Sequence, residues 1–298
     1  MNMQCRGLGV ALATPFLNDG SLDVAGLGRL CHHVTGGGAD FLVALGSTGE
    51  AAMLDDAERD EIVAAVRAHA ERTPVVVGTG ASSTAHAVAQ TRRAAALGAD
   101  GALVVVPPYT RPTQQGLVAH FRAIAEAVPE LPIILYNVPS RAATNMLPAT
   151  VSLLWQLPNI VAIKESSGDL GQIARIAAEL PSGKTLLAGD DALALPTIAV
   201  GGHGLVSVAG NIVPALMRDL VATARSGAVE QAQAQFAALL PLFEALSLEP
   251  NPIPIKTALA ILGIAEPVMR LPLLAAGATT RERLQQAIAG LRTEVLHG

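Results

Sequence analysis

Eight short apolar segments alternate with amphipathic segments over the first 227 residues, and this alternation constrains the fold more than any other feature. The apolar segments are rich in β-branched residues and carry no polar face, as is typical of strands buried on both sides. The predicted strands are residues 8–14, 41–45, 75–77, 103–106, 133–138, 160–164, 185–188 and 205–208. Buried strands that alternate with helices indicate a parallel sheet, and eight such units match a closed (β/α)8 TIM barrel. A doubly wound open sheet is the main alternative, although no GxGxxG motif follows the first predicted strand.

The segments between the strands have apolar residues at helical spacing. The predicted helices are residues 23–35, 55–71, 84–97, 114–128, 147–155, 170–180, a helix after Asp190-Asp191, and residues 214–225. After Gly227 the pattern changes to helices only, at residues 228–246, 254–262 and 280–296. We therefore predict a catalytic barrel of residues 1–227 and a C-terminal three-helix extension of residues 228–298.

Composition and charge exclude several classes of function. The net charge is −5 and lysine and arginine are not clustered, which argues against nucleic acid or an acidic membrane as partner. No signal peptide or membrane-spanning segment is expected, because each apolar run is broken within about a dozen residues, and we expect a cytoplasmic protein. Two distant cysteines, Cys5 and Cys31, are too few for a disulfide framework. The seven histidines show no HExxH motif or paired spacing, so we predict no metal site.

One lysine at the end of a buried strand is the first candidate for chemistry. The chain has only three lysines, and Lys164 directly follows the apolar residues 160–163. A buried ammonium group needs a counter-ion, a lowered pKa or a role, and a neutral amine can attack a carbonyl group to form a Schiff base. Lys164 is therefore either such a nucleophile or a salt-bridged structural residue. Lys184 is expected in a solvated turn, and Lys256 at the start of a helix that is rich in prolines.

In TIM barrels the chemistry takes place where the strands end, and both tyrosines of the chain lie at strand ends. The alternation of side chains along strands puts Tyr136 and Lys164 on equivalent faces of neighbouring strands. If those faces point inward, the phenol can relay protons during imine formation, and the small Ala162 leaves room for the lysine. A buried structural tyrosine is the alternative. Tyr109 lies just beyond the fourth predicted strand.

Three further polar groups follow predicted strands. Ser47 and Thr48 lie between glycines, where their donors can hold a small carboxylate, or they cap the following helix. Arg141 is either a bidentate carboxylate clamp or a surface arginine. Asp190 and Asp191 open a helix, so capping is favoured over metal binding.

These segments resemble one family. The motifs that carry the resemblance are GSTGE at Gly46–Glu50, YNVPSR at Tyr136–Arg141, IKESSGD at Ile163–Asp169, AGDDALALP at Ala188–Pro196 and NPIPIK at Asn251–Lys256. They are similar to those of the dihydrodipicolinate synthase/N-acetylneuraminate lyase family, in unbroken order from Gly7 to about Leu274. The resemblance implies a (β/α)8 barrel with a C-terminal helical domain, a homotetramer of tight dimers, and a metal-independent class I aldolase that needs no cofactor and binds pyruvate as an imine.

The resemblance also implies roles for individual residues. Lys164 would form the imine, Tyr136 would donate and accept protons, and Thr48 and Tyr109 would complete a proton relay. Tyr109 would reach into the active site of the dimer partner. The residues implied to surround pyruvate are Ser47, Thr48, Gly189 and Val206. Arg141 would bind the carboxylate of the second substrate.

Within the family, the segments at Tyr136 and Lys164 resemble the synthase branch, which implies condensation of pyruvate with L-aspartate 4-semialdehyde. Ser47 matches the lyases instead, and Pro108-Tyr109-Thr110 departs from the usual pair of tyrosines. The alternatives are an aldolase of the same family that acts on a sugar-derived 2-oxo acid, and a non-catalytic pyruvate-binding barrel.

Feedback inhibition by lysine is expected to be weak or absent. In the inhibited members of the family, lysine binds at the tight-dimer interface. The matching positions here hold Ser82, His86, Asp56 and Arg59, beside Ala51 and Ala52. His86 replaces a glutamate, and Arg59 adds a cation to a pocket for a cationic ligand.

Overall fold

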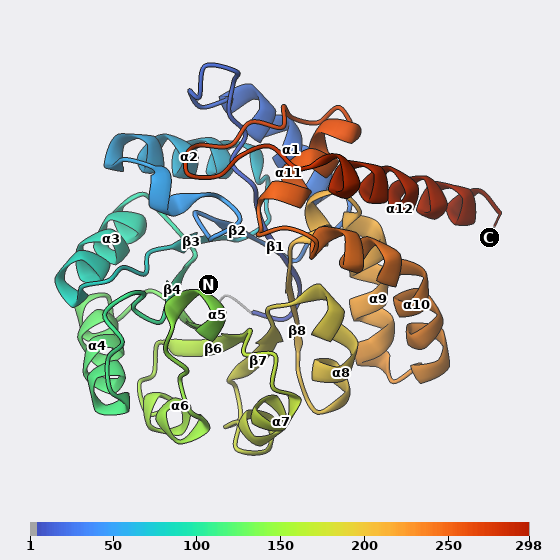
Figure 1. The fold of residues 1–298 in the computed structure, drawn as a ribbon. Coiled ribbons are helices and arrows are strands. Elements are labelled where there is room, and N and C mark those ends of the chain that lie inside the picture. Colours follow the sequence, from blue (N-terminus) through green and yellow to red (C-terminus); the bar gives the residue numbers. More distant parts are fainter. Residues whose placement is uncertain (1–4, 298) are drawn as a thin grey trace.

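Eight parallel strands form a closed barrel in which each strand pairs with the next and β8 pairs with β1 (Figure 1). The computed structural model describes residues 5–297, and side chains up to residue 291. The strands are β1 (Gly7–Ala11), β2 (Phe41–Ala44), β3 (Val75–Gly78), β4 (Gly101–Val105), β5 (Ile133–Asn137), β6 (Ile160–Glu165), β7 (Thr185–Ala188) and β8 (Gly204–Ser207). The predicted (β/α)8 fold is confirmed, and the open sheet is excluded.

Helices surround the barrel, as the amphipathic segments predict (Figure 1). They are α1 (Val24–Gly36), α2 (Asp56–His69), α3 (Thr84–Ala96), α4 (Gln114–Ala127), α6 (Pro148–Leu154), α7 (Leu170–Ala178), α8 (Ala194–Ala199) and α9 (Pro214–Ser226). Side-chain caps mark several starts: Asp55 forms a capping box with Glu58, and Ser83, Thr113 and Asp169 each accept a hydrogen bond from the backbone of the first turn.

Four short elements follow strands at their carboxyl ends and were not predicted individually. They are η1 (Ala51–Met53), α5 (Pro139–Ala142), η2 (Asp191–Leu193) and η3 (Ala209–Asn211). None exceeds four residues, which is too short for an apolar period to be recognised. They follow β2, β5, β7 and β8 and carry much of the rim on which the candidate site is built.

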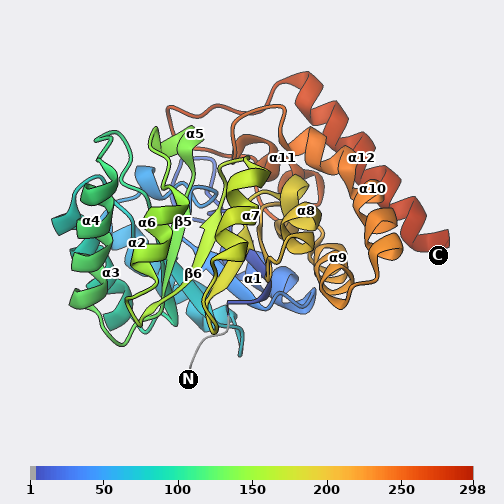
Figure 2. The same ribbon diagram turned by 90° about the horizontal axis from the view of Figure 1, so that it is seen from below.

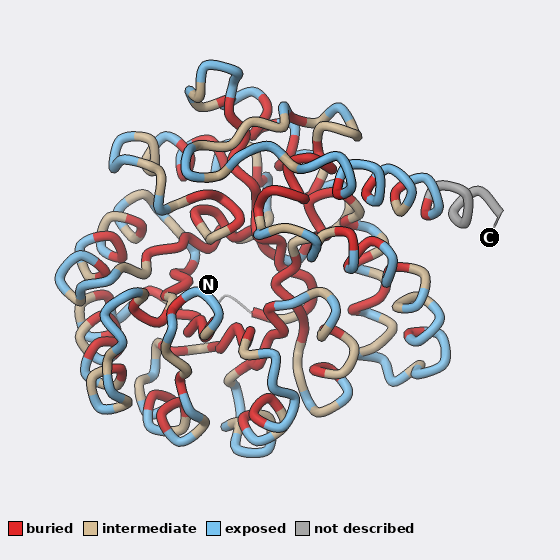
Figure 3. The backbone as a smooth tube through the Cα atoms, viewed as in Figure 1, coloured by how far each residue is buried: buried red, intermediate tan, exposed pale blue. Residues whose placement is uncertain are grey.

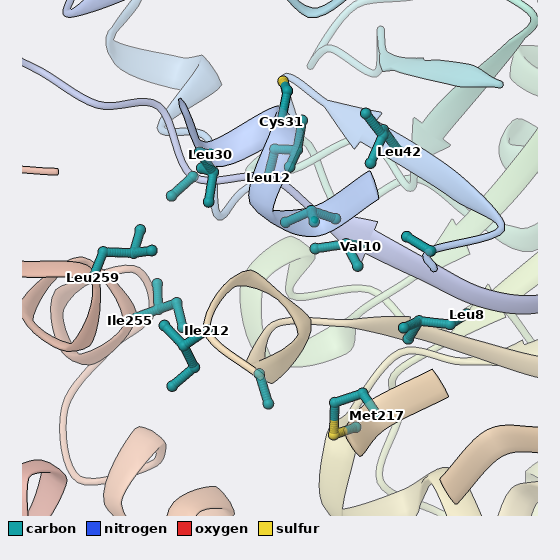
Figure 4. Packing of buried hydrophobic residues seen from close by; sticks show 14 of the residues in the cluster. Leu8, Val10, Leu12, Leu30, Cys31, Leu42, Ile212, Met217, Ile255 and Leu259 are labelled. Atoms are coloured by element: carbon teal, nitrogen blue, oxygen red, sulfur yellow. The ribbon is translucent and has the colours of Figure 1, made fainter. Parts of the chain in front are cut away.

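The barrel has two apolar layers, and Figure 3 shows the strands as an almost continuously buried ring. The interior is filled by one cluster that includes Val43, Val76, Ala162, Leu187 and Val206. Outside the strands, a larger cluster joins β1, α1, α9 and the C-terminal helices. Figure 4 shows its members Leu8, Leu30, Met217, Ile255 and Leu259. The C-terminal helices therefore share the core of the barrel.

Three helices follow the barrel, α10 (Val229–Leu246), α11 (Ile253–Ile261) and α12 (Ala278–His297), as predicted from the sequence. They lie on one side of the barrel, where α10 packs against α8 and α9, and α11 and α12 pack against α10 and each other (Figure 2). The guanidinium group of Arg270, between α11 and α12, donates to the carbonyl oxygens of Gly20 and Met53. The division into two domains at residue 227 stays a prediction. Among the described residues, none of the helices combines the length and apolar character that crossing a membrane requires.

Candidate active site

Lys164 and Tyr136 lie side by side at the carboxyl ends of β6 and β5. The two residues are directly paired between the strands, and Lys164 Nζ lies 4.3 Å from the centre of the Tyr136 ring. Both side chains are at least nine-tenths buried, and Ala162 lies in the same barrel interior. Among the described residues, no carboxylate oxygen lies within 4.0 Å of Lys164 Nζ, so the amine is not held in an ion pair. The geometry thus fits the nucleophile and not the salt-bridged alternative.

A cavity of about 280 Å³ is lined by Tyr136, whereas Lys164 lies behind the tyrosine and is not among the lining residues. Its polar lining includes Ser47, Arg59, Tyr136 and Arg141, and its apolar lining includes Leu103. Two arginine side chains face this cavity, and none of its lining residues is acidic. Such a cavity suits small ligands that carry carboxylates.

Ser47 and Thr48 begin the loop after β2, and they differ in exposure. Ser47 lines the cavity, whereas Thr48 is 2% exposed and its Oγ1 accepts a hydrogen bond of 2.9 Å from Asn251 Nδ2. Neither residue caps a helix, because α2 is capped by Asp55 and η1 has no side-chain cap. The capping alternative for this segment is therefore wrong.

Arg141 lies in α5, and its side chain is exposed but makes one specific hydrogen bond. Its side chain lines the cavity, and its Nη2 donates a hydrogen bond of 2.8 Å to the carbonyl oxygen of Asn251. No carboxylate of the described residues pairs with it, so most of its donors are available to a ligand. The geometry thus fits the predicted clamp better than an uninvolved surface arginine.

Gly189, which follows β7, lies beside the lysine because it has no side chain. A Cβ atom added there would lie 1.8 Å from Ser166 Oγ and 3.0 Å from Lys164 Cε. Val206, on β8, is fully buried in the barrel interior. Neither residue is among those that line the cavity of about 280 Å³, so their predicted contact with pyruvate stays a prediction.

Tyr109 lies outside the site of its own chain. It follows β4, its side chain is 91% exposed, and its backbone has a left-handed φ of 72°. It is not among the cavity-lining residues, so its predicted role in the partner's site also stays a prediction.

The capping role expected for Asp190 and Asp191 is wrong, since neither side chain caps the helical turn that follows. Asp191 instead accepts hydrogen bonds from Ser207 Oγ and from the backbone N–H groups of Val208 and Ala209, which fixes the end of β8. Burial raises the pKa of Asp191 despite these bonds. Burial also raises the pKa of Asp190, while the positive charges of Lys164 and Arg141 lower it.

A second buried carboxylate supports the lysine strand from outside the barrel. Glu165 Oε1 and Oε2 accept hydrogen bonds from Asn137 Nδ2, and Oε1 also accepts one from the backbone N–H of Ser167. Burial raises the pKa of Glu165, and these hydrogen bonds oppose that shift. The network connects the ends of β5 and β6, the strands that carry Tyr136 and Lys164.

The other two lysines lie where the sequence predicts, but neither amine is simply solvated. Lys184 closes the predicted turn through its backbone N–H, which donates to the carbonyl oxygen of Pro181, and its Nζ donates to three carbonyl groups next to the start of β6, those of Leu157, Pro158 and Ile160. Lys256 is 1% exposed within α11 and pairs with Glu50 at 2.6 Å. Burial lowers the pKa of Lys256 to about 8, and the adjacent carboxylate opposes that shift.

Sequence reasoning thus missed two contributors to the site, Asn251 and the Glu50–Lys256 pair. The available signal was their place in the motifs, since Glu50 ends GSTGE and both Asn251 and Lys256 lie in NPIPIK. Within the described part of the chain, no group of three or more His, Cys, Asp or Glu side chains is arranged to hold a metal ion.

Comparison with known proteins decides the family. The sequence matches the dihydrodipicolinate synthetase family over residues 4–291, nearly its whole length. The chain belongs to this family.

Curated relatives in the family are similar over nearly their full lengths. The 4-hydroxy-tetrahydrodipicolinate synthase of Cyanothece sp. is 44% identical over 282 residues, which cover 94% of this chain and 96% of the relative. The enzyme of the same name from Stenotrophomonas maltophilia is 48% identical over 273 residues, which cover 91% of each chain.

Solved structures of the family have the same architecture. The dihydrodipicolinate synthase of Thermotoga maritima superimposes with a TM-score of 0.93 at 37% identity, covering 95% of this chain and 97% of the other. The 4-hydroxy-tetrahydrodipicolinate synthase of Methylacidiphilum fumariolicum gives a TM-score of 0.95 at 38% identity, covering 99% of this chain and 98% of the other.

Proposed function

We propose that the protein is a lyase of the class I aldolase type, a 4-hydroxy-tetrahydrodipicolinate synthase. It condenses pyruvate with L-aspartate 4-semialdehyde in lysine and diaminopimelate biosynthesis. The observation that carries this proposal is the pairing of Tyr136 and Lys164 at the carboxyl end of the barrel, where Tyr136 lines a cavity that also contains two arginines. Relatives at 43–48% identity that bear this enzyme's name support the choice of reaction.

In the proposed reaction, Lys164 Nζ attacks the C2 carbonyl carbon of pyruvate, and loss of water leaves a protonated imine, a Schiff base. Removal of a proton from C3 gives an enamine, whose C3 attacks the aldehyde carbon of the second substrate to form the new carbon–carbon bond. The amine of that substrate then attacks the imine carbon, which closes the ring and releases Lys164. Tyr136 lies against the lysine and is placed to move these protons, with Thr48 and Tyr109 as its relay.

The residues around the pair divide between the two substrates. Ser47, Thr48, Gly189 and Val206 are assigned to pyruvate, and Arg141 to the carboxylate of the semialdehyde. A planar guanidinium group can bind that carboxylate through two hydrogen bonds. The free donors of Arg141 at the cavity support this assignment.

The assembly follows from the same proposal. We take the protein to be a cytoplasmic homotetramer built from tight dimers, with residues 228–298 as a helical extension of the barrel. The nearly complete exposure of Tyr109 supports a partner that covers it, because a large aromatic side chain is rarely left so open.

Ser47 favours a second candidate, an aldolase for a sugar-derived 2-oxo acid, since the lyase branch has serine at this position. Steady-state turnover of pyruvate with aspartate semialdehyde, compared with a panel of sugar aldehydes, separates the two candidates. A higher kcat/KM for the semialdehyde is expected, and a higher value for a sugar aldehyde would contradict the proposal. If borohydride traps no pyruvate adduct, the non-catalytic barrel is the correct interpretation.

A further inference from the structure

The protein contains a second buried lysine that the proposed reaction does not use. Lys256 Nζ lies 2.6 Å from Glu50 Oε1, and both side chains are at most 1% exposed. Lys256 Nζ also lies 4.1 Å from the centre of the Phe16 ring, and Glu50 Oε2 accepts a hydrogen bond from the backbone N–H of Arg270. The pair is therefore enclosed by the barrel on one side and by the C-terminal segment on the other.

A buried ion pair seldom stabilises a protein more than an apolar pair of the same size, because both charges lose their hydration. Its established benefit is geometric, since two charges with fixed partners specify one arrangement of the segments that carry them. Here 206 residues separate the two partners along the chain, and each lies within five residues of a group at the candidate site. Thr48 is two residues before Glu50, and Asn251 is five residues before Lys256.

Asn251 contacts two residues to which the proposed function assigns roles. Its Nδ2 donates to Thr48 Oγ1 at 2.9 Å, and its carbonyl oxygen accepts from Arg141 Nη2 at 2.8 Å. Since Thr48 Oγ1 accepts this hydrogen bond, its own proton is free, and no described residue accepts it. The contact thus directs the Thr48 hydroxyl to act as a donor, and the second contact holds Arg141 at the cavity.

We propose that Lys256 and Glu50 are positioning residues. They fix the C-terminal segment on the loop after β2, so that Asn251 orients the Thr48 hydroxyl and the Arg141 guanidinium group. The C-terminal helices thereby become part of the active site without touching the reacting atoms. This inference rests on the proposed function for the roles of Thr48 and Arg141.

The test compares three variants with the wild-type protein. Glu50→Gln/Lys256→Gln removes both charges together, because removal of one alone leaves an unpaired buried charge that endangers folding. Asn251→Ala removes the side-chain contact to Thr48 and leaves both the ion pair and the backbone carbonyl that Arg141 contacts. Lys184→Gln is the matched control, a half-buried lysine whose three carbonyl acceptors lie at the opposite, amino-terminal end of the strands.

Two kinetic readouts are measured well below each variant's unfolding temperature. One is the rate at which borohydride-trappable pyruvate adduct forms, which reports on Thr48. The other is the KM for the semialdehyde, which reports on Arg141. We expect the double variant to slow adduct formation about tenfold and raise this KM about tenfold, the effect of one lost hydrogen bond to a charged or reacting group. Asn251→Ala should slow adduct formation to the same extent and leave this KM nearly unchanged, because the backbone carbonyl that holds Arg141 remains. Lys184→Gln should lose thermal stability and keep both values.

Amide hydrogen exchange gives a readout that does not depend on activity. In the double variant, exchange should rise both in residues 46–52 and in residues 250–256, the segments that the pair holds together. Wild-type kinetics and unchanged exchange in a folded double variant would overturn the proposal. If the wild-type protein itself forms no adduct, the proposed function fails, and the exchange measurement still decides the positioning role.

Discussion

Tyr136 and Lys164 are direct partners across β5 and β6, and the lysine nitrogen lies 4.3 Å from the centre of the tyrosine ring. The register of a closed parallel barrel enforces this contact, because a slip of β6 by one residue would turn Lys164 to the opposite face from Tyr136. The phenol and the amine therefore meet as a direct result of the strand pairing, and no flexible loop has to bring them together.

Only Lys164 should form the pyruvate adduct. Of the three lysines, Lys184 donates to carbonyl groups at the start of β6 and Lys256 is paired with Glu50, so neither amine is free. Peptide mapping of the borohydride-reduced protein should find the label on Lys164, and Lys164→Ala should not be labelled. A label on Lys184 or Lys256 would refute the assignment.

Arg141→Ala should chiefly impair use of the semialdehyde and leave formation of the pyruvate imine largely intact. Loss of one charge-assisted clamp should cost about 2–4 kcal/mol in transition-state binding, measured as kcat/KM for the semialdehyde. Arg122→Ala is the matched control, since Arg122 is an exposed arginine on the outer helix α4. An unchanged kcat/KM in Arg141→Ala would favour the sugar-aldolase alternative.

Gly189→Ala should lower the rate of imine formation at least tenfold. The added methyl group would lie 1.8 Å from Ser166 Oγ and 3.0 Å from Lys164 Cε, so one of these atoms must move. Gly36→Ala, in α1, is the control, because a methyl group there meets no atom within 4 Å. Stopped-flow trapping of the imine measures both variants. Equal rates would show that the lysine side chain tolerates the displacement.

Free lysine should inhibit the protein weakly or not at all. Arg59 occupies the corresponding pocket, where Nη1 donates to the carbonyl oxygen of Ala51 and Nη2 to that of Gly78. Asp56, the nearby anion, is already engaged by Gln90 and Arg93. A lysine ammonium group would meet a cation without a free counter-charge, which should weaken binding roughly 100-fold or more. Initial rates at saturating pyruvate test this, and half-inhibition below about 1 mM lysine, or ~4 kcal/mol of binding, would contradict it.

Acidification should destabilise the protein through His120. Burial lowers the pKa of this histidine to about 4, and its Nε2 is buried without a hydrogen-bond partner. In the unfolded chain this histidine therefore binds a proton near pH 6.5, whereas in the folded protein it stays neutral down to about pH 4. The contribution of His120 to the free energy of unfolding is therefore fully present above pH 6.5 and is lost as the pH falls toward 4. The expected loss from this group is about 2 kcal/mol between pH 7 and pH 5.

Urea unfolding of the wild-type protein and of His120→Gln at both pH values measures this loss. Other titrating groups contribute equally to the two proteins, so the difference isolates His120. Parallel pH dependence in both proteins would show that His120 is not the acid-sensitive group.

The alternation of strands and helices was sufficient to predict the barrel. Each strand–helix unit is a continuous stretch of sequence, and the spacing of its apolar residues depends on which faces of the strand and helix are buried. The same pattern predicted that Tyr136 and Lys164 lie next to each other, because side chains alternate along a strand and equivalent positions of adjacent strands meet. The roles of these two residues stay predictions, as do those of Thr48, Tyr109 and Arg141.

The local pattern could not predict contacts between distant segments. Lys256 was correctly predicted at the start of a helix, but its partner, Glu50, lies 206 residues away and no local pattern indicates it. Asp191 looked like a helix cap because a helix follows it, whereas its hydrogen-bond donors belong to the end of β8. In both cases the partner depends on tertiary packing: α11 lies on the loop after β2, and β8 pairs with β7, and the local sequence indicates neither contact.

The contact between Thr48 and Asn251 also bears on how the protein is made. Ribosomes release a chain from its N-terminus at about 5–20 residues per second, so Thr48 emerges roughly 10–40 s before Asn251, which lies 203 residues later. During that interval the nascent barrel strands can pair, but the Thr48 hydroxyl lacks its donor and the Glu50 carboxylate lacks its lysine. The candidate site can therefore be completed only after residues 251–256 have left the ribosome, long after the first barrel strands have emerged.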